Sequence, residues 1–219
     1  VYGGPSLAVR RMAIALRASG FEVDLATTTA DGAGELDRPL GEAVEEDGGR
    51  TFYFARQTHA WTFSWPLRRW LAREAAGYDL LHVHALFSFP SFAACGAARR
   101  AGVPYLLRPL GQLDAWSMAT KGWKKRPYYE LFERRNLADA TFVHVTSEAE
   151  REFVDGLGFG SKARVIPNGI ELPPWPPAAT VRAGAAAKTK GERVVVLSLS
   201  RLHPKKGLEA LFAAVARLA

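Results

Sequence analysis

Short apolar runs alternate with amphipathic stretches along most of this 219-residue chain. The clearest runs, residues 79–86, 103–111 and 141–147, are continuous enough in apolar character to be buried strands. Helical spacing of apolar residues appears before them, for instance in residues 9–16. This alternation predicts an α/β fold, in which a Rossmann-like parallel sheet carries helices on both faces. Such sheets bind ligands at the carboxyl ends of their strands.

The composition changes along the chain and suggests how it is organised. Residues 31–49 are acidic and glycine-rich, and we expect a loop there. Residues 172–192 are rich in proline and alanine without any period, which is typical of a linker. We therefore predict a domain at 1–171, a linker at 172–192 and the first strand and helix of a second domain at 193–219. Because almost nothing precedes the first turn, we expect the fold to be truncated at both ends.

The net charge and the cysteine content indicate which kind of partner and which cellular compartment suit this chain. The formal net charge is +7, and basic residues gather between Arg99 and Arg135. A basic face suggests an anionic partner such as a nucleotide, a lipid headgroup or a nucleic acid, although a solvated face explains it equally. No nucleic-acid-binding motif occurs. The single cysteine, Cys95, cannot form an internal disulfide, which favours a reducing compartment.

A glycine pair opens the chain. Gly3 and Gly4 stand in "GGPS", directly before the first predicted helix. Glycines at a helix N-terminus let backbone amides approach an anion, which the helix dipole favours. The same residues also suit a tight turn with Pro5 at the start of the helix. The chain contains neither G-x-G-x-x-G nor a Walker A sequence.

Two histidines and an arginine lie near predicted strand ends. His82 and His84 share one face of a strand, and His84 is nearer its carboxyl end, so His84 is the one expected to meet a substrate. We expect His82 to be a hydrogen-bonded core residue. No cysteine or carboxylate has a spacing that would complete a metal site, so none is predicted. Arg108 ends an apolar strand and needs an anionic or carbonyl partner, from a ligand or from within the fold.

Two further segments combine cations with other features. In "SRLHPKKG", Arg201 and Lys206 lie between a predicted strand and a helix, where two cations suit a diphosphate. A basic surface turn is the alternative. The segment "HAWTFSWPLRRW", residues 59–70, contains three tryptophans and two arginines, which suits sugar stacking, a membrane interface or the packing of a helix entry.

Several of these segments also occur in one order that resembles the family 4 retaining glycosyltransferases of the GT-B type. They are "GGPSLAVRRMAIALRASGFEVDLAT", "YDLLHVHAL", "PYLLRPLGQLDAW", "NLADATFVHVTSEAE", "VIPNGIELP" and "LSLSRLHPKKGLEALF". The resemblance implies two Rossmann-like domains, an acceptor-side domain at 1–171 and a donor domain that begins at 193. It implies that Arg201 and Lys206 grip the donor diphosphate and that the loop of Gly3 and Gly4 lies near donor and acceptor.

The resemblance also places Asn168 and Gly169 at the interdomain hinge, and His84 or Arg108 on the acceptor side. The implied reaction transfers a hexose from a UDP- or GDP-linked sugar to a polysaccharide or lipid-linked glycan, without cofactor or metal. The implied location is the cytoplasm, with peripheral contact to the anionic inner face of a membrane. The family's first strand and its C-terminal glutamate pair have no counterpart here, so we expect the 219 residues alone to be inactive. The alternatives are a non-catalytic membrane- or anion-binding Rossmann module and another nucleotide-dependent Rossmann enzyme such as an epimerase.

Overall fold

The computed structural model describes residues 3–170, 196–200, 202 and 204–217. The chain divides into two compact units, Val1–Gly169 and Ile170–Ala219. The assignment of these parts to an acceptor-side domain, a linker and a donor domain stays a prediction.

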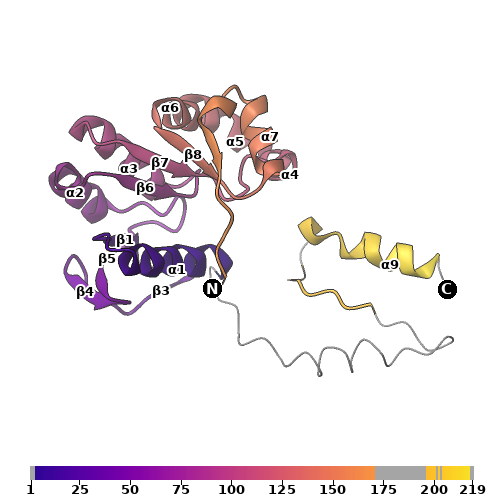
Figure 1. Ribbon diagram of the computed structural model, residues 1–219, viewed down its shortest axis with the longest axis horizontal. Coiled ribbons are helices and arrows are strands. Elements are labelled where there is room, and N and C mark those ends of the chain that lie inside the picture. The colour runs from indigo at the N-terminus through magenta and orange to yellow at the C-terminus, as the bar shows by residue number, and fades with distance from the viewer. Residues whose placement is uncertain (1–2, 171–195, 201, 203, 218–219) are drawn as a thin grey trace. The chain divides into compact units, whose positions relative to one another are not determined.

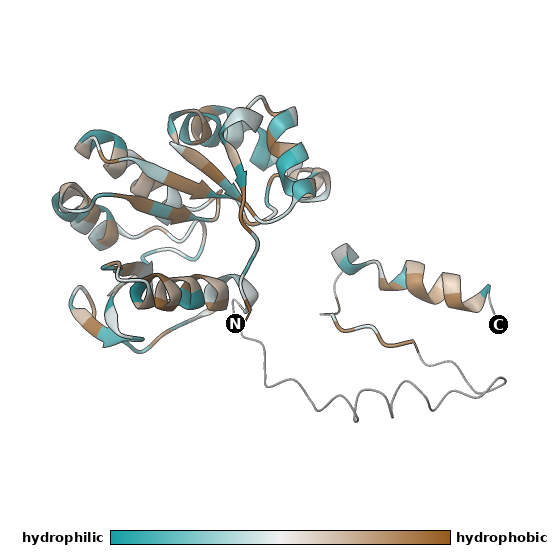
Figure 2. Ribbon diagram, viewed as in Figure 1, coloured by the Kyte–Doolittle hydropathy of each residue, from teal (hydrophilic) through white to brown (hydrophobic). Residues whose placement is uncertain are grey.

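The first unit contains a four-stranded parallel sheet in the order β6-β7-β8-β9 (Figure 1). Its strands are β6 (Leu81–His84), β7 (Tyr105–Arg108), β8 (Phe142–Val145) and β9 (Ala163–Val165). The middle strands are apolar because one sheet face is buried: Leu107, Val143 and Val145 are fully inaccessible to solvent. Hydrophobic residues accordingly follow these strands in Figure 2. The predicted parallel α/β sheet flanked by helices is confirmed.

The helices of this unit pack around the sheet. They are α1 (Gly4–Ala18), α2 (Trp65–Glu74), α3 (Phe89–Ala101), α4 (Ala115–Ala119), α5 (Gly122–Tyr128), α6 (Arg134–Asp139) and α7 (Glu148–Gly156), with short 3₁₀ turns η1 (Ala75–Gly77) and η3 (Gly160–Lys162). A π-helical segment, η2 (Tyr129–Glu133), lies between α5 and α6. Pro127, which cannot donate a backbone hydrogen bond, lies just before this segment.

The expected loop at residues 31–49 is wrong in part. This region contributes to the two-stranded sheet of β2 (Ala30–Asp31) and β3 (Gly34–Glu35), and to β4 (Ala43–Glu46), which pairs antiparallel with β5 (Gly49–Phe54). The β4–β5 turn is Asp47-Gly48, and both residues have positive φ, as a type I′ hairpin requires. The Asp-Gly pair was the sequence signal for this hairpin.

The parallel strands of the first unit belong to separate sheets. β1 (Leu25–Thr28) pairs with β5, in a sheet of order β1-β5-β4, and no described strand joins β1 to β6. Helix α1 buries only Ala13 among its residues, and its Leu7 and Ile14 remain exposed. In a doubly wound sheet, the first strand of the fold lies between the strands that correspond to β1 and β6.

Two buried clusters hold the first unit together. One lies under the four-stranded sheet and joins strand residues such as Leu107 and Val143 to Leu137 and Val154 of the helices. The other joins Phe54 of β5 to α2 and α3. Residues from β5, α2 and α3 therefore form a rigid block beside the sheet. Among the described residues, no helix is long and apolar enough to cross a membrane.

The second unit contains the 3₁₀ turn η4 (Pro204–Lys206) and the helix α9 (Leu208–Ala216). The helix agrees with the apolar spacing that predicted it. The strand expected at 193–200 lies partly outside the described residues. Its described part, residues 196–200, is not in a strand.

Candidate functional site

A row of polar side chains crosses the four-stranded sheet near the carboxyl ends of its strands. His84 of β6 pairs in register with Arg108 of β7. The register of β7 with β8 places His144 on the other side of Arg108. His82 shares the face of His84, and the two ring centroids are 4.2 Å apart. The fold thus brings together two residues singled out from sequence, His84 and Arg108, and adds His144.

The histidines of this row form a neutral chain. His144 Nε2 lies 2.8 Å from the backbone oxygen of Ile166 and so must donate to it. In a neutral ring its Nδ1 then accepts from His82 Nε2, at 3.2 Å. Burial lowers the pKa of His82 to about 4, with help from His144 and Arg108. The prediction of His82 as a hydrogen-bonded core histidine therefore agrees with its contacts.

His84 is poorly suited to proton transfer near neutral pH. Burial lowers its pKa to about 2, and the neighbouring His82 and Arg108 act in the same direction. A useful general base has a pKa close to the working pH. His84 Nδ1 is also buried without a hydrogen-bond partner among the described residues. The geometry therefore favours a contact role for His84 over a role as base.

The charged side chain of Arg108 is buried. It is 1% exposed, and its guanidinium donates to Oδ1 of Asn168, so its partner is a side-chain carbonyl. Its Nε has no partner among the described residues, and none of the ion pairs found in that part of the chain includes it. Burial lowers the pKa of Arg108, and the carboxylate of Glu150 opposes this effect. The predicted acceptor-side and hinge residues Arg108 and Asn168 are thus in contact.

The loops that follow β6 and β7 have strained backbones. Ala85 and Phe87 after β6, and Leu110 after β7, have φ angles of 71°, 56° and 57°. Non-glycine residues rarely adopt this left-handed region, at about 1–2 kcal/mol each. Strain of this kind persists where surrounding contacts enforce it, and it gathers at functional sites. Here it marks the carboxyl edge of the sheet, where such folds bind ligands.

Two buried carboxylates enforce the shape of these loops. Glu133 is fully buried and accepts hydrogen bonds from the backbone N–H of Phe87, at 2.6 Å, and from Asn136 Nδ2, at 2.9 Å. Burial raises the pKa of Glu133. Glu150 accepts from the backbone N–H of Gly111 at 2.6 Å. Each carboxylate therefore fixes one loop at the candidate site.

Glu133, Glu150 and His144 were missed from sequence. Glu150 follows the N-cap Ser147 by three residues, which is the capping-box spacing, and Ser147 does accept from the N–H of Glu150. That spacing is a local signal for the start of a helix, but it gives no sign of the contact to Gly111. Glu133 and His144 gave no local signal, because their partners are distant in sequence.

The remaining predicted residues lie on other elements. Gly3 is the N-cap of α1 with a φ of 56°, whereas Gly4 already belongs to the first helical turn rather than to a loop. Gly169 follows Asn168 and is exposed. In the second unit, Lys206 ends η4 and is exposed, just before the N-cap Gly207 of α9. Arg201 lies outside the described residues. No group of His, Cys, Asp or Glu in the described part of the chain could hold a metal ion.

Comparison with known proteins adds the following. A family model described as "Glycosyl transferase 4-like domain" matches residues 3–169. Three crystal structures of Anabaena Alr3699/HepE are similar: with UDP and glucose (TM-score 0.59, 20% identity), with UDP (0.58, 21%) and with UDP-glucose (0.58, 22%). The matches cover 98–99% of this chain but only 54–55% of those chains, so the chain spans about half their length. At this identity the likeness concerns the fold. A search of curated protein sequences found no match.

Proposed function

Since this chain belongs to the family of glycosyl transferase 4-like domains, we propose that it is the acceptor-side part of a retaining glycosyltransferase. The enzyme transfers a hexose from a UDP- or GDP-linked sugar to a polysaccharide or lipid-linked glycan. The observation that carries the proposal is the carboxyl edge of the sheet, where the contact of Arg108 with Asn168 lies beside strained loops.

The roles proposed for the individual residues start from the charge that develops during the reaction. Negative charge grows on the leaving diphosphate as the glycosidic bond breaks, and cations fixed beside it stabilise that transition state. Arg201 and Lys206 take this role in the proposal. His84 and Arg108 contact the acceptor, the N-terminal turn at Gly3 and Gly4 lies near both substrates, and Asn168 with Gly169 forms the hinge.

The test uses the open reading frame that contains this chain. The protein is incubated with UDP-glucose, UDP-galactose or GDP-mannose and with glycan and lipid-linked glycan acceptors. Mass spectrometry detects transfer, and NMR gives the anomeric configuration of the product. We expect a product with the anomeric configuration of the donor, and loss of transfer in Lys206→Met. Arg151→Met, which removes a cation from the exposed side of α7, is the matched control.

Two results would refute parts of this proposal. An inverted product excludes the retaining reaction. Full activity in Lys206→Met excludes its role at the diphosphate. The 219 residues alone are expected to transfer no sugar, and transfer by them would contradict that expectation. If no donor is bound or turned over while anionic vesicles are bound, the chain is instead a non-catalytic membrane-binding module.

We also propose that the enzyme touches an anionic membrane surface through α5 and its flanks. Trp123 is 76% exposed, and the ammonium group of Lys124 lies 4.7 Å from its ring centroid. Leu131 is 69% exposed in the following segment, and Lys121 and Arg126 are exposed nearby. Exposed aromatic and basic side chains together suit the boundary between headgroups and acyl chains.

Co-sedimentation with phosphatidylglycerol-containing vesicles tests this contact. We expect binding that weakens as salt rises and that falls in the variant Trp123→Ser with Lys124→Gln. Arg134→Gln, another exposed cation close in sequence, is the control for general charge. Equal binding by all three proteins, or binding only to neutral vesicles, would exclude this surface.

A further inference from the structure

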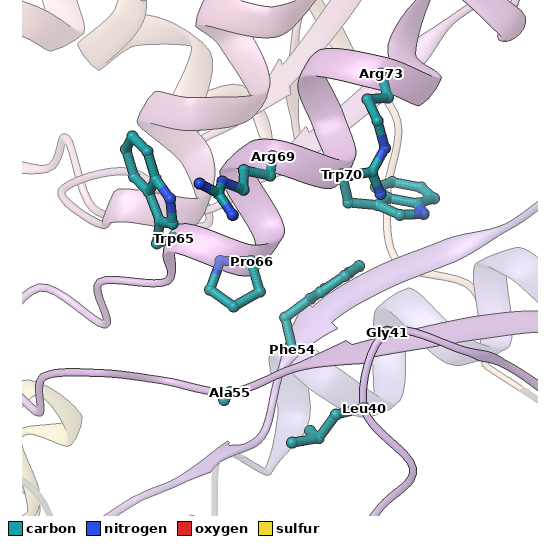
Figure 3. Close-up of a pocket in the computed structure, with 9 residues that line it drawn as sticks. All are labelled: Leu40, Gly41, Phe54, Ala55, Trp65, Pro66, Arg69, Trp70 and Arg73. Atoms are coloured by element: carbon teal, nitrogen blue, oxygen red, sulfur yellow. The ribbon is translucent and has the colours of Figure 1, made fainter.

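A pocket of about 290 Å³ lies between α2 and the carboxyl end of β5, away from the row of histidines (Figure 3). Its lining residues are Leu40, Gly41, Phe54, Ala55, Trp65, Pro66, Arg69, Trp70 and Arg73. The floor is apolar because Phe54 and Trp70 are buried with ring centroids 5.6 Å apart. This volume is near the lower end for ligand pockets, about 300 Å³, so it suits one small unit of a ligand.

The rim of the pocket is cationic. Arg69 and Arg73 are one helical turn apart and project from the same face of α2 (Figure 3). The guanidinium of Arg69 lies 5.6 Å from the ring centroid of Trp65, a cation–π contact that orients it. The ion pair found for Arg73 within the described residues is an exposed one of 3.8 Å with Glu74. The lining residues, all of them described, include no carboxylate that could neutralise the two arginines.

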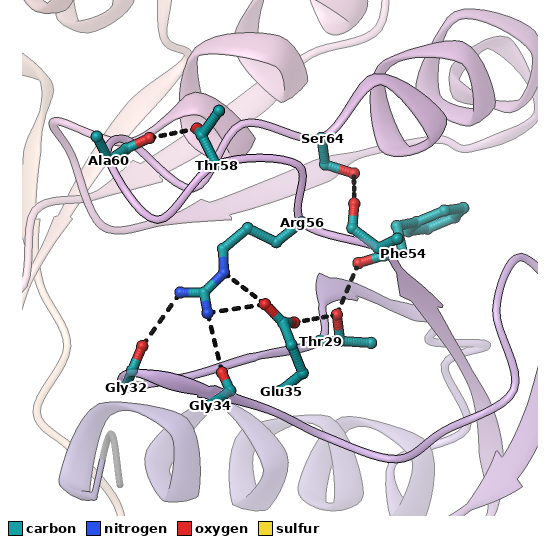
Figure 4. A network of polar contacts seen from close by, with 10 residues as sticks. Thr29, Gly32, Gly34, Glu35, Phe54, Arg56, Thr58, Ala60 and Ser64 are labelled. Carbon is teal, nitrogen blue, oxygen red and sulfur yellow. Dashed lines mark hydrogen bonds and ion pairs between the residues drawn. The ribbon is translucent and has the colours of Figure 1, made fainter.

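A second pocket of about 290 Å³ adjoins the first, and the two share Leu40 and Ala55. Its lining includes two carboxylates, Glu35 and Asp37, and two arginines, Arg38 and Arg56, so its charges balance. Arg56, whose side chain is 2% exposed, holds Glu35 by an ion pair of 2.7 Å and also donates to the carbonyls of Gly32 and Gly34 (Figure 4). This wall is therefore rigid.

The two pockets differ in the chemistry that they accept. Carboxylate oxygens accept hydrogen bonds from hydroxyl groups and repel anions. Guanidinium groups bind carboxylates and phosphates, often with two parallel hydrogen bonds. A ligand that spans both pockets therefore needs an anionic unit at Arg69 and Arg73. The second pocket, with two carboxylates and two arginines in its lining, suits a neutral, hydroxyl-rich unit.

From this arrangement we infer that Trp65, Arg69 and Arg73 form a binding subsite for a saccharide unit that carries a carboxylate or phosphate group, with a neutral sugar in the adjoining pocket. Naming this saccharide as the acceptor rests on the proposed function. The subsite itself lies within one unit and requires no donor.

Binding is measured by NMR on the 219-residue chain, without any nucleotide sugar. The Nε–Hε resonances of arginine are followed during titration with glucuronic acid, glucose 6-phosphate, glucose and inorganic phosphate. We expect both acidic sugars to shift the resonances of Arg69 and Arg73, with the more strongly bound one identifying carboxylate or phosphate as the preferred group. Glucose alone and phosphate alone should bind at least tenfold more weakly.

The variant Arg69→Gln with Arg73→Gln should lower the affinity for the acidic sugars at least tenfold. Arg134→Gln, an exposed arginine away from the pocket lining, should leave it unchanged, and circular dichroism checks that both variants remain folded. The inference would be overturned by any of three results: unchanged affinity in the double variant, failure of both acidic sugars to bind, or binding of phosphate alone as strong as that of the acidic sugars. Because no donor is present, failure of sugar transfer by the enzyme would leave this result unaffected.

Discussion

Replacing His82 by Gln should make the stability of this protein less sensitive to acid. The pKa of His82 is about 4 in the folded chain because of its burial and the nearby His144 and Arg108. In the unfolded chain the pKa returns to about 6.5. Between these values the unfolded chain binds a proton that the folded chain does not. The free energy of unfolding therefore falls as the pH falls from about 6.5 toward 4.

The magnitude follows from linkage at about 1.4 kcal/mol for each pKa unit. From pH 7 to pH 4.5, His82 should contribute a loss of about 2.5 kcal/mol in the free energy of unfolding, a large part of the 5–15 kcal/mol typical of a domain. The variant lacks this contribution but keeps that of His84. Its stability at pH 7 should also be lower, because the hydrogen bond to His144 is removed.

Urea denaturation followed by circular dichroism, at fixed ionic strength and at pH 7, 6, 5 and 4.5, measures the effect. The quantity compared is the slope of the unfolding free energy against pH. We expect a mean slope lower than that of the wild type by about 1 kcal/mol per pH unit in His82→Gln. His59→Gln, which removes an exposed histidine from a loop, is the control. Equal slopes in the wild type and in His82→Gln would refute the reasoning.

Three other outcomes follow from buried contacts. Glu133→Ala should lower the free energy of unfolding by about 1–3 kcal/mol, because the N–H of Phe87 loses its acceptor, and Glu133→Gln should lower it less; equal losses in urea denaturation would argue against the hydrogen bond as the cause. Ser64→Ala removes the N-cap of α2 and should cost about 1 kcal/mol in thermal unfolding, whereas the exposed Thr58→Ala should cost less than about 0.5 kcal/mol. Cys95 is fully buried, which raises its pKa to about 12, so it should react with a thiol reagent at pH 8 only after urea is added. Rapid labelling of the native chain would show that α3 opens from the sheet.

Much of the architecture was predictable because its signals are local. Continuous apolar runs predicted β6, β7 and β8, and helical spacing predicted α1 and α9. The acidic segment before β5 was expected to be a loop because it is charged and rich in glycine. It contains an Asp-Gly hairpin instead, whose strands are held together by cross-strand pairing rather than by apolar burial. The π-helical interruption at Tyr129–Glu133 was also missed, since backbone hydrogen bonding in a helix leaves little trace in the apolar pattern.

The sequence by itself determined the class of sheet, the position of His84 and Arg108 at its carboxyl edge, and the family to which the chain belongs. These depend on periodicity and motif order, which are properties of neighbouring residues. Only the tertiary structure decided which distant groups meet. It put Asn168 against Arg108, linked His144 to His82, placed Glu133 under the loop at Phe87, and aligned two arginines of α2 over an apolar pocket. Such contacts depend on strand register and on packing between elements far apart in sequence, and neither is encoded in any single segment.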